Sequence, residues 1–293
     1  MRMNVLVIFL LLACFISINA QQEEKDKRKS HNEQFGFERD YFRNGKPSID
    51  ISYGFANAKL KDSGIDFERN GIIDLKLGYK YTAQYRHGNI VRFRNSYVHG
   101  SLISPQIDLK SNDLEAETWR FGIGSATGYG YKLGRKSSVV FHNSNSLTWT
   151  RYDGNYSGFS YDSAAYNEIF QKLEPFSESF RFGTGTEAGI LIPIWGILGF
   201  QMQYDRTLVF PRHMFWMWLG SAAIEFTAQS AIDLFIIAIL KSTPEAVPIV
   251  DFILKNGLSY GIYELRREKM NWPFNSEKPL LFDSFKLGFT FTL

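Results

Sequence analysis

Hydrophobic and polar residues alternate one by one along most of the chain. The pattern is clearest over residues 118–133, where Trp119, Phe121 and Ile123 alternate with Arg120 and with glycines. Because successive side chains of a β-strand point to opposite faces, this alternation predicts a strand with one apolar and one polar face. Strands of this kind are predicted at residues 48–60, 72–85, 90–102, 118–133, 138–151, 179–192, 194–205 and 281–293.

The connections between these strands are short and long in turn. The links at 86–89, at 134–137 and around Pro193 are short, whereas those at 61–71, 103–117 and 152–178 are longer. Transmembrane β-barrels join their strands by short turns at one end and by longer loops at the other. Each strand of about 11 to 16 residues is long enough to cross a bilayer at a tilt. The pattern therefore predicts an all-β fold, a transmembrane antiparallel β-barrel of about eight strands.

The polar faces of the predicted strands carry charges of both signs, and in a membrane barrel these faces line the lumen. An eight-stranded barrel is narrow and is filled by its own side chains, so opposite charges can pair across it and a general porin is not expected. The charged side chains expected in the lumen include Arg92, Arg94, Arg120, Arg181, Glu187 and Asp205.

Residues 211–279 break the alternation and predict a helical insertion before the last strand. One polar stripe follows the first helix at a spacing of four residues, at Ser221, Glu225, Gln229 and Asp233. We interpret Glu225 and Asp233 as a docking face that forms salt bridges with Arg266 and Arg267. Because an eight-stranded barrel cannot accommodate a helix, we expect the insertion outside the lumen, against the rim or in the membrane interface.

The N-terminal residues predict a secretory signal. Arg2 precedes an apolar run that ends in small residues, and we expect cleavage after Ala20. The only cysteine is Cys14, so the mature chain would contain no disulfide bond. The predicted organisation is a signal peptide at 1–20, a polar, flexible lead-in at 21–47 and the barrel at 48–293.

Composition agrees with a membrane barrel. Aromatic residues make up 16% of the chain, and such residues concentrate at membrane interfaces. The formal net charge is +3, which does not indicate a nucleic-acid partner. The sequence contains no P-loop, HExxH or CxxC motif, so we expect neither a cofactor nor a metal site.

The signal, the cysteine-free alternating strands and the terminal strand FKLGFTFTL together resemble the Gram-negative outer-membrane β-barrel class. The resemblance covers residues 48–210 and 281–293 as a class pattern. It implies an outer-membrane location, contact with outer-membrane lipid, and recognition of the last strand by the barrel-assembly machinery. The class usually ends on an aromatic residue, whereas here Leu293 is last and Phe291 lies two positions before it.

One short motif suggests catalysis. His142-x-Ser144-Asn145 resembles the H-x-S-N core shared by outer-membrane phospholipase A and the outer-membrane lipid A deacylase. The resemblance implies a lipid acyl hydrolase in which His142 is the base and Ser144 the nucleophile. Residues two apart on a strand share a face, so an imidazole there can accept a hydroxyl proton.

Two departures from those enzymes weigh against catalysis. The phospholipase has a W-N-R segment whose Asn orients the histidine, whereas this chain has Trp149-Thr150-Arg151. The enzymes also carry the pair on the lipid-facing wall, but here Leu147 and Trp149 are the apolar residues, which turns the motif inward. An orienting acid would have to come from another strand, and Glu187 is a candidate by residue type.

A basic and aromatic segment at residues 206–218 contains Arg206 and Arg212. The segment would either bind an anionic lipid headgroup or form part of the aromatic interfacial belt, and the two roles considered for its arginines are headgroup binding and helix docking. The sequence thus favours a non-enzymatic outer-membrane barrel that binds or passes a small or lipidic molecule or has a structural role. The alternatives are the acyl hydrolase and a secreted, soluble, lipocalin-like binder.

Overall fold

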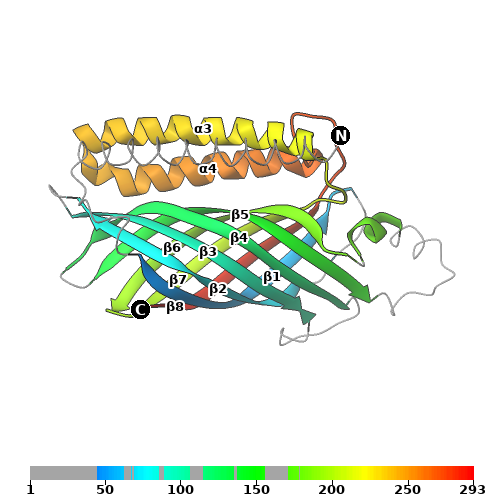
Figure 1. Ribbon diagram of the computed structural model, residues 1–293, viewed down its shortest axis with the longest axis horizontal. Helices are drawn as coiled ribbons and strands as arrows, with labels where there is room; N and C mark the ends of the chain where they lie inside the picture. The colour runs from blue at the N-terminus through cyan, green and yellow to red at the C-terminus, as the bar shows by residue number, and fades with distance from the viewer. Residues whose placement is uncertain are drawn as a thin grey trace, which may run out of the picture.

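The computed structural model describes residues 45–62, 67, 69–85, 89–105, 115–134, 137–155, 171–177 and 179–293. The predicted signal peptide and its cleavage site lie outside these residues, as does the lead-in up to residue 44. The described strands form one closed barrel in which each strand pairs with its neighbours in chain order and β8 pairs back onto β1 (Figure 1). The prediction of an all-β, eight-stranded antiparallel barrel is confirmed.

The observed strands lie within a few residues of the predicted ones, but the turn predicted around Pro193 is at residues 196–197, so Pro193 and Ile194 belong to the sixth strand. The strands are β1 (Lys46–Leu60), β2 (Arg69–Gln84), β3 (Ile90–Ser104), β4 (Glu115–Lys132), β5 (Ser138–Asn155), β6 (Arg181–Trp195), β7 (Leu198–Val209) and β8 (Leu280–Thr292). The short links lie at one end of the barrel, here called the turn end, and the longer links lie at the opposite, outer end. A short 3-10 helix, η3 (Glu174–Phe176), precedes β6 at the outer end.

Closure by the last strand leaves no open edge in the barrel. Residues of β8 pair with β1 in register, with Phe289 opposite Ile51 and Phe291 opposite Ile49. These four side chains lie on the outer face, where Phe289 and Ile51 are each 49% exposed. The alternation of FKLGFTFTL therefore places its aromatic side chains outside and those of Lys286 and Thr290 inside. The backbone of β8 pairs with β1 on one side and with β7 on the other.

The two faces of β3 are exchanged relative to the prediction: the side chains expected in the lumen, Arg92 and Arg94, lie on the outer face. The register pairs Arg92 with Ala83 and Tyr129, which places it on the outer face, whereas Phe93 and Tyr97 point inward and are buried. The inward rings fill space left by small residues of β4. A Cβ at Gly124, for example, would lie 2.7 Å from the Tyr97 ring.

The lumen consists of three layers. An apolar cluster closes the outer end and includes Ile72, Ile103, Tyr152 and Phe176. A second apolar cluster lies toward the turn end and includes Phe93, Tyr97, Val140 and Leu191. Between the two clusters lies a polar layer in which the charged inward side chains meet.

The insertion forms a helical hairpin along the outside of the barrel. Helix α3 (Phe215–Ser242) is followed by the 3-10 turn η4 (Pro244–Ala246) and by α4 (Val247–Glu268), and α4 lies between α3 and the strands (Figure 1). The chain leaves β7 and enters β8 at the outer end, so the hairpin points back toward the turn end. There the Tyr131 hydroxyl donates a hydrogen bond of 2.7 Å to the Glu245 carbonyl.

The helical insertion was predicted outside the lumen, at the rim or in the membrane interface. It does lie outside the lumen, but it packs along the outer face of the barrel and not only at the rim. Helix α4 contacts β4, β5, β6 and β7 in turn, because it runs along the barrel while the strands are tilted. We call the outward side chains beneath it the covered strip, which comprises Arg92, Tyr129, Asn143, Arg206, Leu208, Leu281 and Asp283. The remaining outer face, the bare wall, exposes apolar side chains that include Ile51, Leu75, Leu77, Val98, Ile123 and Phe289.

Candidate functional site

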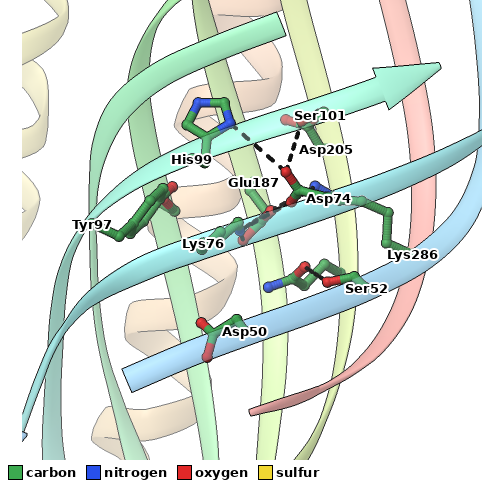
Figure 2. A network of polar contacts seen from close by, with 12 residues as sticks. Asp50, Ser52, Asp74, Lys76, Tyr97, His99, Ser101, Glu187, Asp205 and Lys286 are labelled. Carbon is green, nitrogen blue, oxygen red and sulfur yellow. Dashed lines mark hydrogen bonds and ion pairs between the residues drawn. The ribbon is translucent and has the colours of Figure 1, made fainter. Parts of the chain in front are cut away.

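A group of buried charges occupies the middle of the lumen (Figure 2). Lys76 donates two hydrogen bonds to the Glu187 carboxylate, at 2.8 and 2.7 Å. Lys286 bonds to Asp74 at 2.9 Å and lies 3.3 Å from Glu187. The Ser101 hydroxyl donates a further hydrogen bond of 2.7 Å to Asp74. Glu187, the candidate orienting acid, is therefore held by two lysines.

Two further ion pairs extend this network. Lys80 pairs with Asp50 at 2.5 Å, and both contact the Thr290 hydroxyl. Arg120 lies 3.5 Å from Asp205. Four acidic and four basic side chains thus meet in the described part of the lumen. They are Asp50, Asp74, Glu187, Asp205, Lys76, Lys80, Arg120 and Lys286. The four positive and four negative charges of these ion pairs cancel. Such pairing is expected, because buried charges are tolerated only when they are paired.

The described side chains fill the polar layer tightly. Two small cavities within it measure about 10 Å³ each, and that space accommodates about one water molecule apiece. The apolar clusters described above close the lumen on either side of this layer. The interior of the barrel, as far as the described residues show it, is therefore a packed core.

The predicted catalytic residues His142 and Ser144 both point into this core. Their exposed fractions are 5% and 1%, so the outer face of the barrel does not present them. The Ser144 hydroxyl lies 2.5 Å from the Tyr97 hydroxyl and donates to the Ser125 carbonyl at 3.2 Å. The His142 ring packs against Phe93, with ring centroids 5.7 Å apart, and its Nδ1 atom has no hydrogen-bond partner among the described residues. The structure does not bring these two side chains together as nucleophile and base.

The remaining residues predicted in the lumen separate into two groups. Arg120, Glu187 and Asp205 point into the polar layer, as the contacts above show. Arg181 lies at the outer end of β6, opposite the inward residue Thr150, so the register places it on the lumen face as predicted, away from the ion pairs.

Arg206 docks the hairpin onto the covered strip. Its guanidinium carbon lies 4.5 Å from the centre of the Tyr260 ring, 4.8 Å from Tyr204 and 5.6 Å from Tyr263. The Tyr263 hydroxyl donates a hydrogen bond of 2.8 Å to Asp283 of β8. Of its two proposed roles, Arg206 therefore takes the helix-docking one, since the rings of α4 and β7 surround its cation.

Asn143 is a docking residue that the sequence analysis missed. Its amide donates to the Asn256 side chain at 2.9 Å and to the Ser259 hydroxyl at 3.3 Å, so the outer wall and α4 are joined by hydrogen bonds. The available signal was the run of polar residues on both faces of β5 between Phe141 and Leu147. A polar residue on the lipid-facing side of a strand indicates that something else covers it.

The polar stripe of α3 faces α4 along its whole length. Glu225 pairs with Arg266 at 2.8 Å, and Arg266 also donates to the Ser221 hydroxyl at 3.0 Å. Asp233 pairs with Lys255 at 2.8 Å, where the expected partner was an arginine. Arg267, the other expected partner, pairs instead with Glu264 of its own helix at 2.7 Å. The stripe therefore holds the two helices together and leaves the apolar faces of α3 outward.

A pocket of about 430 Å³ lies on the outside of the barrel wall, at the end where the longer links are. It is here called the outer pocket. The ends of β5 and β6 form one side, and the segment that leads into α3 forms the other. Its lining is aromatic and basic and comprises Trp149, Phe180, Arg181, Phe182, Phe210, Arg212, His213, Phe215 and Trp218. Phe182 is central, with its ring centroid 5.3 Å from that of Trp218 and 4.8 Å from that of His213.

Arg212 lies at the edge of this pocket, on the side of the outer rim. Its Nε atom is 2.9 Å from the Glu277 carboxylate, and its side chain is 63% exposed. No group of three or more metal-ligating side chains is present among the described residues. The outer pocket thus combines aromatic walls with cationic groups.

No protein-family model and no curated protein matches this chain. Three solved structures show a distant likeness. Neisserial surface protein A has a TM-score of 0.38 and 8% identity, over 84% of this chain and 97% of its own. The attachment invasion locus protein Ail of Yersinia pestis has a TM-score of 0.32 and 8% identity, over 85% and 99%. The outer membrane protein OprG of Pseudomonas aeruginosa has a TM-score of 0.30 and 9% identity, over 85% and 97%. By its own strand pairing, the chain is a closed eight-stranded antiparallel β-barrel with a helical hairpin on its outer wall.

Proposed function

We propose that this chain is an integral outer-membrane β-barrel with a closed lumen, which acts without catalysis by binding a lipidic molecule on its outer surface. The observation that carries the proposal is the contrast between inside and outside. The inside is a filled, charge-balanced core, whereas the outside is an apolar surface with a pocket at one end.

The bare wall supports a membrane location. Apolar side chains on neighbouring strands are about half exposed, such as Ile51 at 49%, Leu77 at 46% and Ile123 at 52%. Soluble monomers rarely expose contiguous apolar surface of more than a few hundred Å². In a bilayer the same surface contacts acyl chains, and the closed barrel satisfies every strand without an open edge. This argument also disfavours the soluble, lipocalin-like alternative.

Helix α3 supports the same location. Among the described helices it is the one that is long and apolar enough to cross a membrane, with 28 residues and only 11% of its most apolar stretch buried. Phe226 and Leu234 are 74% and 70% exposed on its outward side. Beside the barrel in a bilayer, that side would contact lipid while the polar stripe remains paired with α4.

The closed lumen directs the search for a ligand to the outside. Cavities of about 10 Å³ cannot hold even a small organic molecule, whereas the outer pocket of about 430 Å³ falls within the range of ligand sites. An outward-facing pocket with aromatic walls, next to an apolar wall, is suited to an amphiphile. The outer membrane is our choice of membrane because the sequence predicts a secretory signal and a barrel-type terminal strand.

Membrane insertion and conductance test this function together. We expect the protein in the outer-membrane fraction, extracted only by detergent, with unboiled protein that migrates differently from boiled protein on a gel. Reconstituted in planar bilayers, it should give no ion conductance, with a general porin as the positive control. Extraction without detergent, or steady channel conductance, would contradict the proposal.

A lipid profile tests the absence of catalysis. Mass spectrometry would compare outer-membrane lipids from cells with the intact protein, with Ser144→Ala, or with neither. We expect the three profiles to be the same, because Ser144 is buried in the lumen. Lysophospholipid or deacylated lipid A that requires both the protein and Ser144 would replace this proposal with the acyl hydrolase.

A further inference from the structure

The turn between β6 and β7 is apolar, unlike the other short links at its end of the barrel. It reads IWGIL over residues 194–198, whereas those links read RHGN at 86–89 and GRKS at 134–137. Trp195 and Ile197 are 71% and 62% exposed. Because exposed apolar side chains that cluster together mark interaction surfaces, this turn has the character of a docking surface.

The last residue of the chain enlarges this apolar surface. The Thr292 N–H group donates a hydrogen bond of 2.8 Å to the Ile197 carbonyl. The Leu293 N–H group donates one of 2.9 Å to the Pro47 carbonyl, and the Leu293 residue is 67% exposed. The β6–β7 turn, the C-terminus and the start of β1 are therefore neighbours at the turn end (Figure 1). We call Trp195, Ile197 and Leu293 the turn-end patch.

The turn-end patch lies beyond the last row of the bare wall. In that row, Phe291 of β8 lies opposite Ile49 of β1 and Leu198 of β7. Leu293 stands two residues farther along the chain, which is about 7 Å at the rise of an extended strand. Acyl chains on the bare wall therefore cover that row before they reach the patch, which leaves the patch to a protein segment.

The chain enters the barrel beside this patch and brings aromatic residues with it. The structure describes the barrel from Gly45, two residues before Pro47. Residues 21–34 contain no aliphatic residue and no Phe, Tyr or Trp. The next eight residues contain four aromatic side chains, Phe35, Phe37, Tyr41 and Phe42. Three residues span at most about 11 Å, so the chain keeps Phe42 close to the start of β1.

We propose that residues 35–42 dock on the turn-end patch, with their aromatic rings over Trp195, Ile197 and Leu293. The burial of apolar surface drives the contact. Because the segment is tethered next to the patch, its effective concentration there is high, and a patch of a few side chains is enough to hold it. The inference goes beyond the proposed function, since it concerns neither the lipid-facing wall nor the outer pocket.

Trypsin digestion of the full chain tests the docking, because Arg39 and Arg43 lie within and directly after the segment. The rate of cleavage there, followed by mass spectrometry, tracks the fraction of protein in which the segment is released. We expect slow cleavage of the intact protein. In Ile197→Ser, which removes an apolar side chain from the patch, cleavage should be about fivefold or more faster. Leu133→Ser is the matched control, since Leu133 is a similarly exposed aliphatic residue on another turn. Its cleavage rate should stay within about twofold of the intact protein.

Two further measurements separate docking from an effect on folding. The double change Phe35→Ser and Phe37→Ser alters the segment and not the barrel, so it should also speed cleavage at Arg43. Phe37→Cys and Ile197→Cys in one chain should form a disulfide bond under mild oxidation, whereas Phe37→Cys and Leu133→Cys should not. Gel mobility that changes on boiling shows that the barrel of each variant is folded.

Equal cleavage rates in the intact protein, Ile197→Ser and Leu133→Ser would overturn the docking. A disulfide-linked dimer of Ile197→Cys alone would show that a second copy occupies the patch instead. Cleavage that is slow only in lipid vesicles, and equally slow for all variants, would show that the bilayer protects the segment. Failure of the proposed function is a separate result, because protein extracted without detergent could still show protection that depends on Ile197.

Discussion

The outer surface of this barrel has two parts that share one strand pattern but differ in chemistry. On the bare wall, the outward positions are apolar and about half exposed, as at Leu77 and Phe289. On the covered strip, outward positions include Asn143, Arg206 and Asp283, and these bind α4 through hydrogen bonds and cation–π contacts. The outer face therefore carries these polar side chains where a helix supplies partners for them.

The largest effect should come from a charge placed on the bare wall. Leu77 lies in the middle of β2 and faces outward, so Leu77→Arg would put a cation at the centre of the bilayer. We expect a loss of about 2–4 kcal/mol in the free energy of unfolding, measured by denaturant titration in lipid vesicles. As a control, Leu133→Arg, at the turn end where the residue is 69% exposed, should change stability little. Equal tolerance of arginine at both positions would contradict a lipid-facing wall.

A smaller effect is expected when a polar residue is removed from the covered strip. Asn143→Leu is apolar and would suit a lipid-facing position, but here it leaves Asn256 and Ser259 with fewer hydrogen bonds. We expect a loss of about 1–3 kcal/mol in the same titration, because the helix partners stay buried. Unchanged or increased stability would show that α4 does not dock on β5 as described.

The smallest effect is expected when the Arg206 cation is removed. Arg206→Gln keeps a polar side chain but removes the cation that lies over the Tyr260 ring. We expect a loss of about 0.5–2 kcal/mol, seen as easier proteolysis of the hairpin while the barrel stays intact. Arg212→Gln, at the exposed rim, is the control and should leave hairpin proteolysis unchanged. If the two variants behave alike, the cation–π contacts do not hold the hairpin.

The sequence predicted the barrel well because the alternation of side chains is a local property of each strand. It predicted the wrong faces for β3 because Arg92, Phe93 and Arg94 fit either face of a strand by residue type alone. For Arg92 the choice depends on α4, which covers it on the outer face. An electrostatic contact between Arg92 and Asp251 of that helix joins residues that are distant in sequence.

The candidate site was less predictable for the same reason. The sequence drew attention to His142 and Ser144, since they stand two residues apart in a known motif. Phe182 and Trp218 of the outer pocket, by contrast, lie on β6 and α3 and meet only because the hairpin begins at the outer end of the barrel. Phe182 was predicted only as an outward strand residue, and Trp218 carried no signal beyond its aromatic neighbours.

The most direct test of the account is chemical labelling of single cysteines in isolated outer membranes. Cys14, in the predicted signal, is the only natural cysteine, so each introduced residue would report its own position. We predict that Leu77→Cys on the bare wall and Phe226→Cys on α3 resist a membrane-impermeant maleimide until the membrane is dissolved and the protein unfolded. Leu133→Cys at the turn end should react at once. If Leu77→Cys and Phe226→Cys react in intact membranes as fast as Leu133→Cys, neither surface faces lipid and the central claim fails.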